Sequence, residues 1–268
     1  SKCSDSRLYI SPSSVGTGKA DMGNTWRSWH DGTFPLWGWD NIPGVFTADI
    51  TIGPLEMAQV RKNPRLAEIM NEYLRPFGFI ELPGLVAGPT PLAHWSNETV
   101  TTIADLAALK TRVSGFMGTK AFGLLGVPTA TMSSSEVVGA LRTGVVDAGI
   151  TGLAYGFQVG WGDAAKNVTL MPFAGPGIDA VIINAEVWDS LPPDLQEILW
   201  EVTSELGLAT ELSIIQAFLE TQFSVESAGI ELNYLTPDEQ SKALELTKSL
   251  DEEYLAVAGP MGPEVISI

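Results

Sequence analysis

The stretch GVVDAGITG at residues 144–152 repeats a pattern that the chain already contains as GKADMG at residues 18–23. Each copy places an aspartate between two glycines, follows a segment of helical character and leads into an apolar run. Glycine is common where a helix ends, because it adopts positive φ without strain. Two such copies far apart in the chain favour two related halves, although a pattern this short also arises by chance.

The composition limits the class of protein. A chain of 268 residues fits one large domain or two smaller ones, and an apolar fraction of 45% is enough to form a core. Its net charge of −17 repels nucleic acids and anionic membrane surfaces. The apolar runs are too short to cross a bilayer. We therefore expect a soluble protein that does not bind nucleic acid.

Helical and strand-like segments alternate along the chain. Apolar spacing predicts helices over 55–75, with an interruption at Pro64, and over 118–126, together with a long helix over about 190–226. Short apolar segments predict strands, among them 7–10, 79–82, 127–132, 144–151, 168–174, 179–184 and 231–235. The Gly/Pro-rich segment 88–96 reads as a crossover connection. This alternation predicts an α/β fold with largely parallel sheets.

Signals for catalysis are weak. The chain contains neither a Gly-x-Ser-x-Gly nucleophile motif nor a phosphate-binding loop of the Walker type. The single cysteine, Cys3, and the two histidines, His30 and His94, do not make a typical zinc site. We expect no enzymatic activity, no cofactor and no metal ion.

Arg112 is the basic residue that stands out. It lies in LKTRVSG, on an apolar segment that runs into a glycine turn. In open α/β sheets ligands bind at the carboxyl ends of the strands, and a guanidinium matches a carboxylate with two parallel hydrogen bonds. Packing at a sheet edge is the alternative. Gly118 and Thr119 could open a helix whose free N–H groups also favour an anion.

Several separated segments together resemble the DctP-type solute-binding proteins of TRAP (tripartite ATP-independent periplasmic) transporters. They are IADLAALKTRVSG, GLLGVPTATMSSSEVVGALRTGVVDAG and AVIINAEVWDSLPPDLQEIL, preceded by GKADMG, GTFPL and IPGVF. The resemblance covers the chain from about residue 7, so the strand and helix with which relatives usually begin are not matched. It implies a type II-like, two-lobed periplasmic binding protein with a hinge and a long helix that spans both lobes.

The resemblance also implies domain boundaries and a site. The first lobe would comprise residues 1–87 plus about 181–225, and the second residues 88–180 plus about 226–268. The ligand would lie between the lobes, with Arg112 pairing with its carboxylate. Further ligand-binding positions implied by the resemblance or by neighbouring aromatic sequence are Thr151, Trp26, Phe116, Ser134, Trp161 and Tyr155.

The resemblance further implies a periplasmic location for a mature chain without its signal peptide, and membrane subunits of a TRAP transporter as partners. We expect a monomer that captures a small organic carboxylate, either aromatic or a 2-oxo or hydroxy acid. A second arginine that some relatives use before Arg112 is not evident. The alternative is an enzyme or a ligand sensor on the same two-lobed scaffold.

Overall fold

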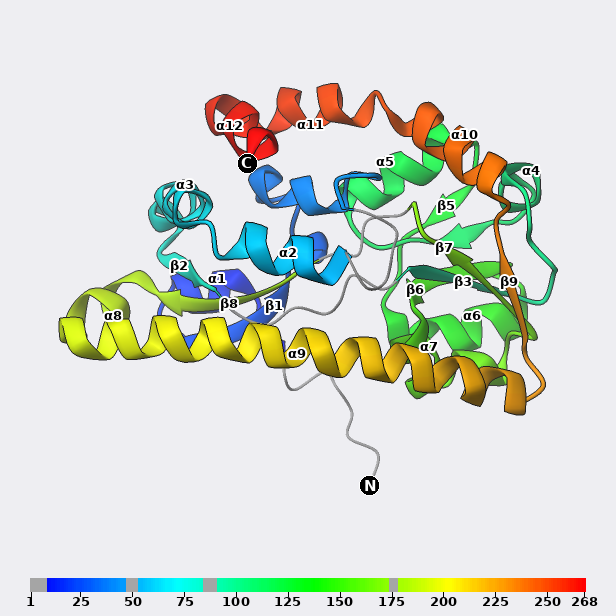
Figure 1. Ribbon diagram of the computed structural model, residues 1–268, viewed down its shortest axis with the longest axis horizontal. Coiled ribbons are helices and arrows are strands. Elements are labelled where there is room, and N and C mark those ends of the chain that lie inside the picture. Colours follow the sequence, from blue (N-terminus) through cyan, green and yellow to red (C-terminus); the bar gives the residue numbers. More distant parts are fainter. Residues whose placement is uncertain (1–8, 47–52, 84–90, 174–177) are drawn as a thin grey trace.

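The computed structural model describes residues 9–46, 53–83, 91–173 and 178–268, and its described strands form two sheets (Figure 1). The smaller sheet has the strand order β1–β8–β2, and the larger sheet has the order β5–β4–β6–β3–β7–β9. The bounds of these strands are β1 Met22–Trp26, β2 Phe79–Leu82, β3 Leu92–Ser96, β4 Thr111–Arg112, β5 Thr129–Ala130, β6 Ala148–Gly152, β7 Asn167–Met171, β8 Asp179–Asn184 and β9 Glu231–Tyr234.

Helices surround both sheets (Figure 1). The α-helices are α1 Pro12–Gly16, α2 Gly53–Arg61, α3 Pro64–Leu74, α4 Ile103–Ala107, α5 Phe116–Leu124, α6 Val137–Thr143, α7 Leu153–Gln158, α8 Ala185–Ser190, α9 Pro193–Ser227, α10 Pro237–Thr247, α11 Leu250–Ala258 and α12 Gly262–Ser267. Short 3₁₀ turns add Arg27–Trp29, Pro35–Asn41, Arg75–Phe77, Ser134–Glu136, Trp161–Asp163 and Gly259–Met261. The expected α/β architecture is confirmed, and the predicted break at Pro64 separates α2 from α3.

The expectation of largely parallel sheets is wrong. In the smaller sheet β8 pairs antiparallel with both of its neighbours. In the larger sheet β4 is parallel to β5 and β6, and β7 is parallel to β9, but β3 runs antiparallel between β6 and β7. The segment 88–96, which was predicted to be a crossover connection, contains the strand β3. Residues 84–90 lie outside the described part. The glycines and prolines of segment 88–96 led to the prediction of a connection where the structure has a central strand.

The two Gly-x-x-Asp-x-Gly copies adopt the same local geometry. Gly18 and Gly144 each follow a helix, and both have a φ of 70°. The strand of each copy, β1 or β6, begins directly after the aspartate. The last glycine of each copy is closely packed in the same way. An added Cβ would come within 2.9 Å of a neighbouring side chain at both Gly23 and Gly149. The repeated pattern therefore reports two helix-to-strand transitions, one in each sheet.

The 35-residue helix α9 connects the two sheets (Figure 1). Pro193 occupies its first turn, where the missing N–H leaves no helical hydrogen bond unmade. Along its length α9 contacts α2 and β2 of one half, and α7 and β9 of the other. The predicted long helix is thus confirmed. The domain boundaries stay a prediction. Helices α11 and α12 belong to the predicted second lobe, but they contact the 3₁₀ turn Pro35–Asn41 of the predicted first lobe.

The predicted strand over 7–10 falls mostly outside the described residues, as does Cys3. Within the described part, Tyr9 forms a single parallel bridge with Asn24 of β1. No helix of the described residues is long and apolar enough to cross a membrane.

A buried ion-pair cluster ties β2 to the segment after β1. Arg27 is 4% exposed and donates to Asp40, at 3.2 Å, and to Glu81 of β2. The indole Nε1 of Trp37 donates to the other Glu81 oxygen at 2.8 Å. Removing one partner from such a cluster leaves uncompensated charge in a medium that solvates it poorly.

Replacing Arg27 with methionine should therefore lower the free energy of unfolding by about 3–5 kcal/mol, since two buried carboxylates lose their cation. Urea denaturation measures this. The matched control is Arg75→Met, which removes an ion pair with Asp189 whose side chains are 47% and 55% exposed. Solvent screens that pair, so the control should change stability little. If both variants lost the same free energy of unfolding, the buried Arg27 cluster would contribute no more to stability than an exposed ion pair.

His94 of β3 is fully buried, and its hydrogen bond selects the tautomer of the neutral ring that carries the proton on Nε2. Its Nε2 lies 3.2 Å from the Thr111 hydroxyl, which itself donates to the Leu109 carbonyl at 3.0 Å. The hydroxyl therefore accepts from Nε2–H, and Nδ1 has no partner among the described residues. Burial lowers the pKa of His94 from 6.5 to about 4.

Because the unfolded chain binds this proton more readily than the folded one, stability should fall as the pH drops from about 6.5 towards 4. The loss from His94 alone is up to about 3 kcal/mol. Urea denaturation at several pH values, compared with His94→Gln, isolates this contribution. The stability advantage of the wild type over the variant should shrink steadily below pH 6.5. An advantage that is independent of pH would contradict the assignment.

Candidate functional site

The candidate site begins at the carboxyl edge of three parallel strands. Arg112 is the last residue of the two-residue strand β4, opposite Ala130 of β5 and Gly149 of β6. Because the three strands are parallel, their carboxyl ends meet at one edge of the larger sheet. This is the position at which open α/β sheets bind ligands.

The Arg112 side chain is held by main-chain oxygens. Its Nε donates to the Met132 carbonyl at 2.9 Å, and its Nη1 donates to the Ile150 carbonyl at 3.2 Å. Arg112 is only 4% exposed, and burial lowers its pKa, but an arginine side chain stays charged in proteins. No carboxylate of the described residues pairs with it. The guanidinium is thus oriented by carbonyl dipoles, but its charge is not neutralised by them.

Three of the predicted residues gather around Arg112. The guanidinium lies over the indole of Trp161, with its Cζ 5.8 Å from the ring centroid. The Trp161 Nε1 donates to the Ser134 carbonyl at 3.1 Å, and the Ser134 hydroxyl lies 2.9 Å from the Tyr155 hydroxyl. Trp161 is fully buried, whereas Ser134 and Tyr155 are half-buried. The cluster therefore combines one cation, one aromatic face and two hydroxyl groups.

Local sequence explains how this cluster is built. Ser133 and Glu136 form the predicted capping box, which fixes the turn that carries Ser134 ahead of α6. Gly149 leaves room for Trp161, since a Cβ there would lie 2.9 Å from the Trp161 Cζ3 atom. The packing of Trp161 therefore explains why Gly149, the last glycine of the repeated pattern, has no side chain.

Thr151 lies on the same sheet face as Arg112. It follows Gly149 by two residues in β6, and Gly149 pairs with Arg112, so their side chains project to one side of the sheet. Thr151 is half-buried and packs close to Gly156 of α7. The described contacts do not join it to the guanidinium directly.

Trp26 and Phe116 lie elsewhere. Trp26 of β1 is opposite Asp179 and meets Trp29 edge to face, with ring centroids 6.5 Å apart. Phe116 begins α5 and is 40% exposed. None of the described contacts joins either ring to Arg112. Trp26 belongs to the smaller sheet and Phe116 to helix α5, and the pairing of β4 with its neighbouring strands positions neither.

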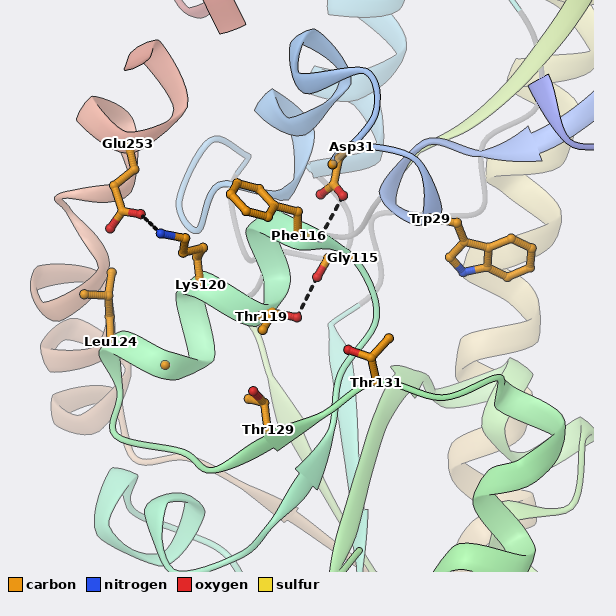
Figure 2. Close-up of a pocket in the computed structure, with 12 residues that line it drawn as sticks. Trp29, Asp31, Gly115, Phe116, Thr119, Lys120, Leu124, Thr129, Thr131 and Glu253 are labelled. Atoms are coloured by element: carbon orange, nitrogen blue, oxygen red, sulfur yellow. Dashed lines mark hydrogen bonds and ion pairs between the residues drawn. The ribbon is translucent and has the colours of Figure 1, made fainter. Parts of the chain in front are cut away.

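A separate hollow of about 780 Å³ lies beside α5 (Figure 2). Figure 2 shows Phe116 and Lys120 towards one end and Trp29 towards the other. Its lining residues are Trp29, Asp31, Gly32, Gly115, Phe116, Thr119, Lys120, Gly123, Leu124, Thr129, Thr131 and Glu253. Arg112 is not among them, but Thr131 is next to Met132, whose carbonyl accepts from Arg112. Of the predicted ligand-binding residues, only Phe116 lines this hollow.

The prediction that a helix begins at Gly118 and Thr119 with free N–H groups for an anion is wrong. Helix α5 begins at Phe116, and the carboxylate of Asp31 accepts from the Phe116 N–H at 2.7 Å and from the Met117 N–H at 3.0 Å. Asp31 is 2% exposed. The chain therefore supplies its own anion to this helix start, from a loop far away in the sequence.

Sequence reasoning missed Asp31 and Trp29. Trp29 is 44% exposed, and its ring also contacts Tyr9, with centroids 5.2 Å apart. Both residues lie in the tryptophan-rich stretch after β1, whose aromatic density was the available signal. Among the described residues, no group of three or more His, Cys, Asp or Glu side chains could hold a metal ion.

The chain is similar to proteins of known family and to solved structures. The model of the family described as bacterial extracellular solute-binding protein, family 7 (DctP), matches residues 58–256. A monocarboxylate 2-oxoacid-binding periplasmic protein of Nostoc sp. is 30% identical over 146 residues, which cover 53% of this chain and 39% of that protein. The match thus spans well under two thirds of that relative's length.

Solved structures share the fold. A TRAP periplasmic solute-binding protein from Desulfovibrio salexigens with bound orotic acid superposes with a TM-score of 0.84 at 23% identity, covering 95% of this chain and 80% of that one. An extracytoplasmic solute receptor of Bordetella pertussis that binds pyroglutamic acid gives a TM-score of 0.83 at 20% identity, covering 98% and 85%. At these identities the likeness establishes the fold and not the ligand.

The packing of Trp161 on Gly149 can be tested without a ligand. Gly149→Ala should lower the free energy of unfolding by about 1–3 kcal/mol, because the added methyl displaces Trp161 or Val137. Gly139→Ala is the matched control, since nothing lies within 4 Å of a Cβ at that helical position. The control should stabilise the protein by about 0.5–1 kcal/mol. Thermal or urea unfolding decides, and a neutral Gly149→Ala would contradict the packing argument.

Proposed function

Because this chain belongs to the bacterial extracellular solute-binding proteins of family 7 (DctP), which are transport receptors and not enzymes, we propose that Arg112 clamps the carboxylate of a small organic acid. The observation that carries the proposal is the guanidinium at the carboxyl edge of β4–β6, buried and without an acidic partner among the described residues. A carboxylate would supply the missing countercharge through two charge-assisted hydrogen bonds.

The surroundings of Arg112 suit the rest of such a ligand. Trp161 offers an aromatic face, and the hydroxyl groups of Ser134 and Tyr155 can donate to oxygens next to the carboxylate. Thr151, on the same sheet face, would add a further hydroxyl. Related proteins are described as binding 2-oxoacids, orotic acid and pyroglutamic acid, which are all small carboxylates or cyclic acids. This supports a small, partly planar monocarboxylate for this chain.

In the proposed cycle the ligand binds while two lobes are apart, and the lobes then close over it. The lobes would be residues 1–87 plus about 181–225, and residues 88–180 plus about 226–268, with Trp26 and Phe116 reaching the ligand on closure. Closure removes apolar surface from water at roughly 25 cal/mol per Å² and excludes the water that competes for Arg112. The ligand stabilises the closed form by its difference in affinity for the two forms. Membrane subunits of a TRAP transporter would then receive the ligand from the closed protein.

The clamp predicts a sharp dependence on Arg112. Orotate, pyroglutamate and pyruvate, each beside its amide, would be tested by thermal shift and then by calorimetry. An acid that binds should stabilise the wild type by about 2.7 kcal/mol at a hundredfold excess over its dissociation constant, and its amide should not. Arg112→Met should abolish the shift, and Arg112→Lys should weaken it strongly, because an ammonium cannot form the same paired bonds.

Arg142→Lys is the matched control, because this arginine is exposed at the end of α6 in the same half of the molecule. It should bind the acid as the wild type does. A folded Arg112→Met variant with unchanged affinity would overturn the clamp.

A further inference from the structure

The helix α9 is apolar on two opposite faces. One face is packed, with Thr203, Phe218 and Val225 at most 5% exposed. At 3.6 residues per turn, the stripe of large apolar side chains on α9 lies about opposite to this face. Its exposed members are Leu195 (43%), Ile198 (52%), Val202 (53%), Leu206 (45%), Leu212 (61%), Leu219 (50%) and Phe223 (75%). We call these seven residues the α9 stripe.

The spacing of the α9 stripe is that of a helix seam. Six of the seven stripe residues fall in a series with alternating steps of three and four residues, as at the a and d positions of a heptad repeat, and Leu206 lies beside this series at an e position. Ala209 continues the seam, and Glu205 and Gln216 are its polar interruptions. A surface helix of a globular protein normally presents polar residues to water, and a contiguous exposed apolar patch marks an interaction site. Figure 1 shows α9 running along one edge of the molecule.

The charges around the α9 stripe have one sign. Helix α9 contains Asp194, Glu197, Glu201, Glu205, Glu211, Glu220 and Glu226, but no lysine, arginine or histidine. The whole chain carries a net charge of −17. A basic surface is therefore attracted to this face, whereas an acidic one, including an anionic membrane, is repelled.

A second copy of the chain fits this face poorly. Two α9 helices packed together would set carboxylates beside carboxylates with no cation from either helix to compensate. The stripe is about 42 Å long, and at a width of about 10 Å it would bury about 800 Å² in total, below the roughly 1,200 Å² of a stable interface. The area therefore favours a weak contact, and the charge favours a partner other than a second copy.

We propose that the α9 stripe is a docking surface for a partner protein that presents an apolar helix flanked by lysine and arginine. The apolar residues of the partner would lie along the seam, and its cations would face the carboxylates of α9. Since α9 contacts both sheets, such a partner would hold the two halves of the molecule together along one line. This inference stands on the surface of α9 and is independent of the Arg112 clamp.

The test uses synthetic amphipathic peptides of about four heptads as probes. One peptide has leucine at a and d with lysine at e and g, a second has glutamate in place of lysine, and a third keeps lysine but has serine at a and d. Fluorescence anisotropy measures binding of each labelled peptide to the folded protein. The first peptide should bind at least about tenfold more tightly than either of the others, and added salt should weaken it.

Variants separate the apolar contact from general attraction to an acidic protein. The triple variant Val202→Gln, Leu219→Gln, Phe223→Gln leaves the charge unchanged and should lose at least about tenfold in affinity. Its matched control carries Leu244→Gln, Leu246→Gln and Leu255→Gln on α10 and α11, where these leucines are 39%, 43% and 36% exposed. The control should bind as the wild type does, and circular dichroism checks that both variants fold.

Equal affinity of the stripe variant and the wild type would overturn the proposal, because charge alone would then explain binding. Equal binding of the lysine and glutamate peptides would overturn the basic partner. Light scattering adds one further outcome. A dimer that forms in the wild type and is lost in the stripe variant would assign the surface to a second copy of this chain and so reject the proposed partner.

Discussion

The positive charge of Arg112, buried at the carboxyl edge of β4, β5 and β6, is the constraint on which the candidate site depends. Two main-chain carbonyls orient the guanidinium, but carbonyl dipoles do not cancel a full charge. A buried cation without a countercharge costs several kcal/mol, and this cost is the physical reason for proposing that the site binds an anion. Met132 follows β5 and Ile150 lies in β6, so the parallel alignment of these strands with β4 brings both carbonyls to this edge. The short strand β4 thereby positions the charged group of the candidate site.

The acidic character of the chain and the cationic site do not conflict. Salt screens charges that are more than about 10 Å apart in solution, so the net charge of −17 acts weakly on a ligand that has reached Arg112. At contact distance the guanidinium dominates, because protein surrounds it and water screens it little. The same acidity on α9 faces solvent and acts on whatever approaches from outside. The two proposed binding surfaces, around Arg112 and along α9, thus carry opposite charges.

Glycines and aromatic rings give this arrangement its rigidity. Gly149 admits the Trp161 ring beneath the guanidinium, and the Trp161 N–H is bound by the Ser134 carbonyl. Asp31 plays a related part beside α5, where its carboxylate occupies the helix start that could otherwise attract a free anion. The competing anion site is filled from within the chain, which leaves Arg112 as the buried cation without a carboxylate at this edge of the sheet.

The sequence by itself determined what depends on neighbours along the chain. Proline and periodicity place the start and length of α9, the Ser133 capping box fixes the start of the α6 region, and glycines mark the turns into β1 and β6. The segment LKTRVSG singled out Arg112, and the resemblance to a known family assigned it the expected role of ligand anchor. These features are readable because caps, turns and helical spacing act over a few residues.

Only the tertiary structure decided which distant segments meet. It made β3 a central antiparallel strand where glycines and prolines indicated a connection, and it brought Trp161 and Tyr155 to Arg112 while placing Trp26 and Phe116 elsewhere. Strand order and register arise from packing between residues far apart in the chain, and side-chain type carries little information about them.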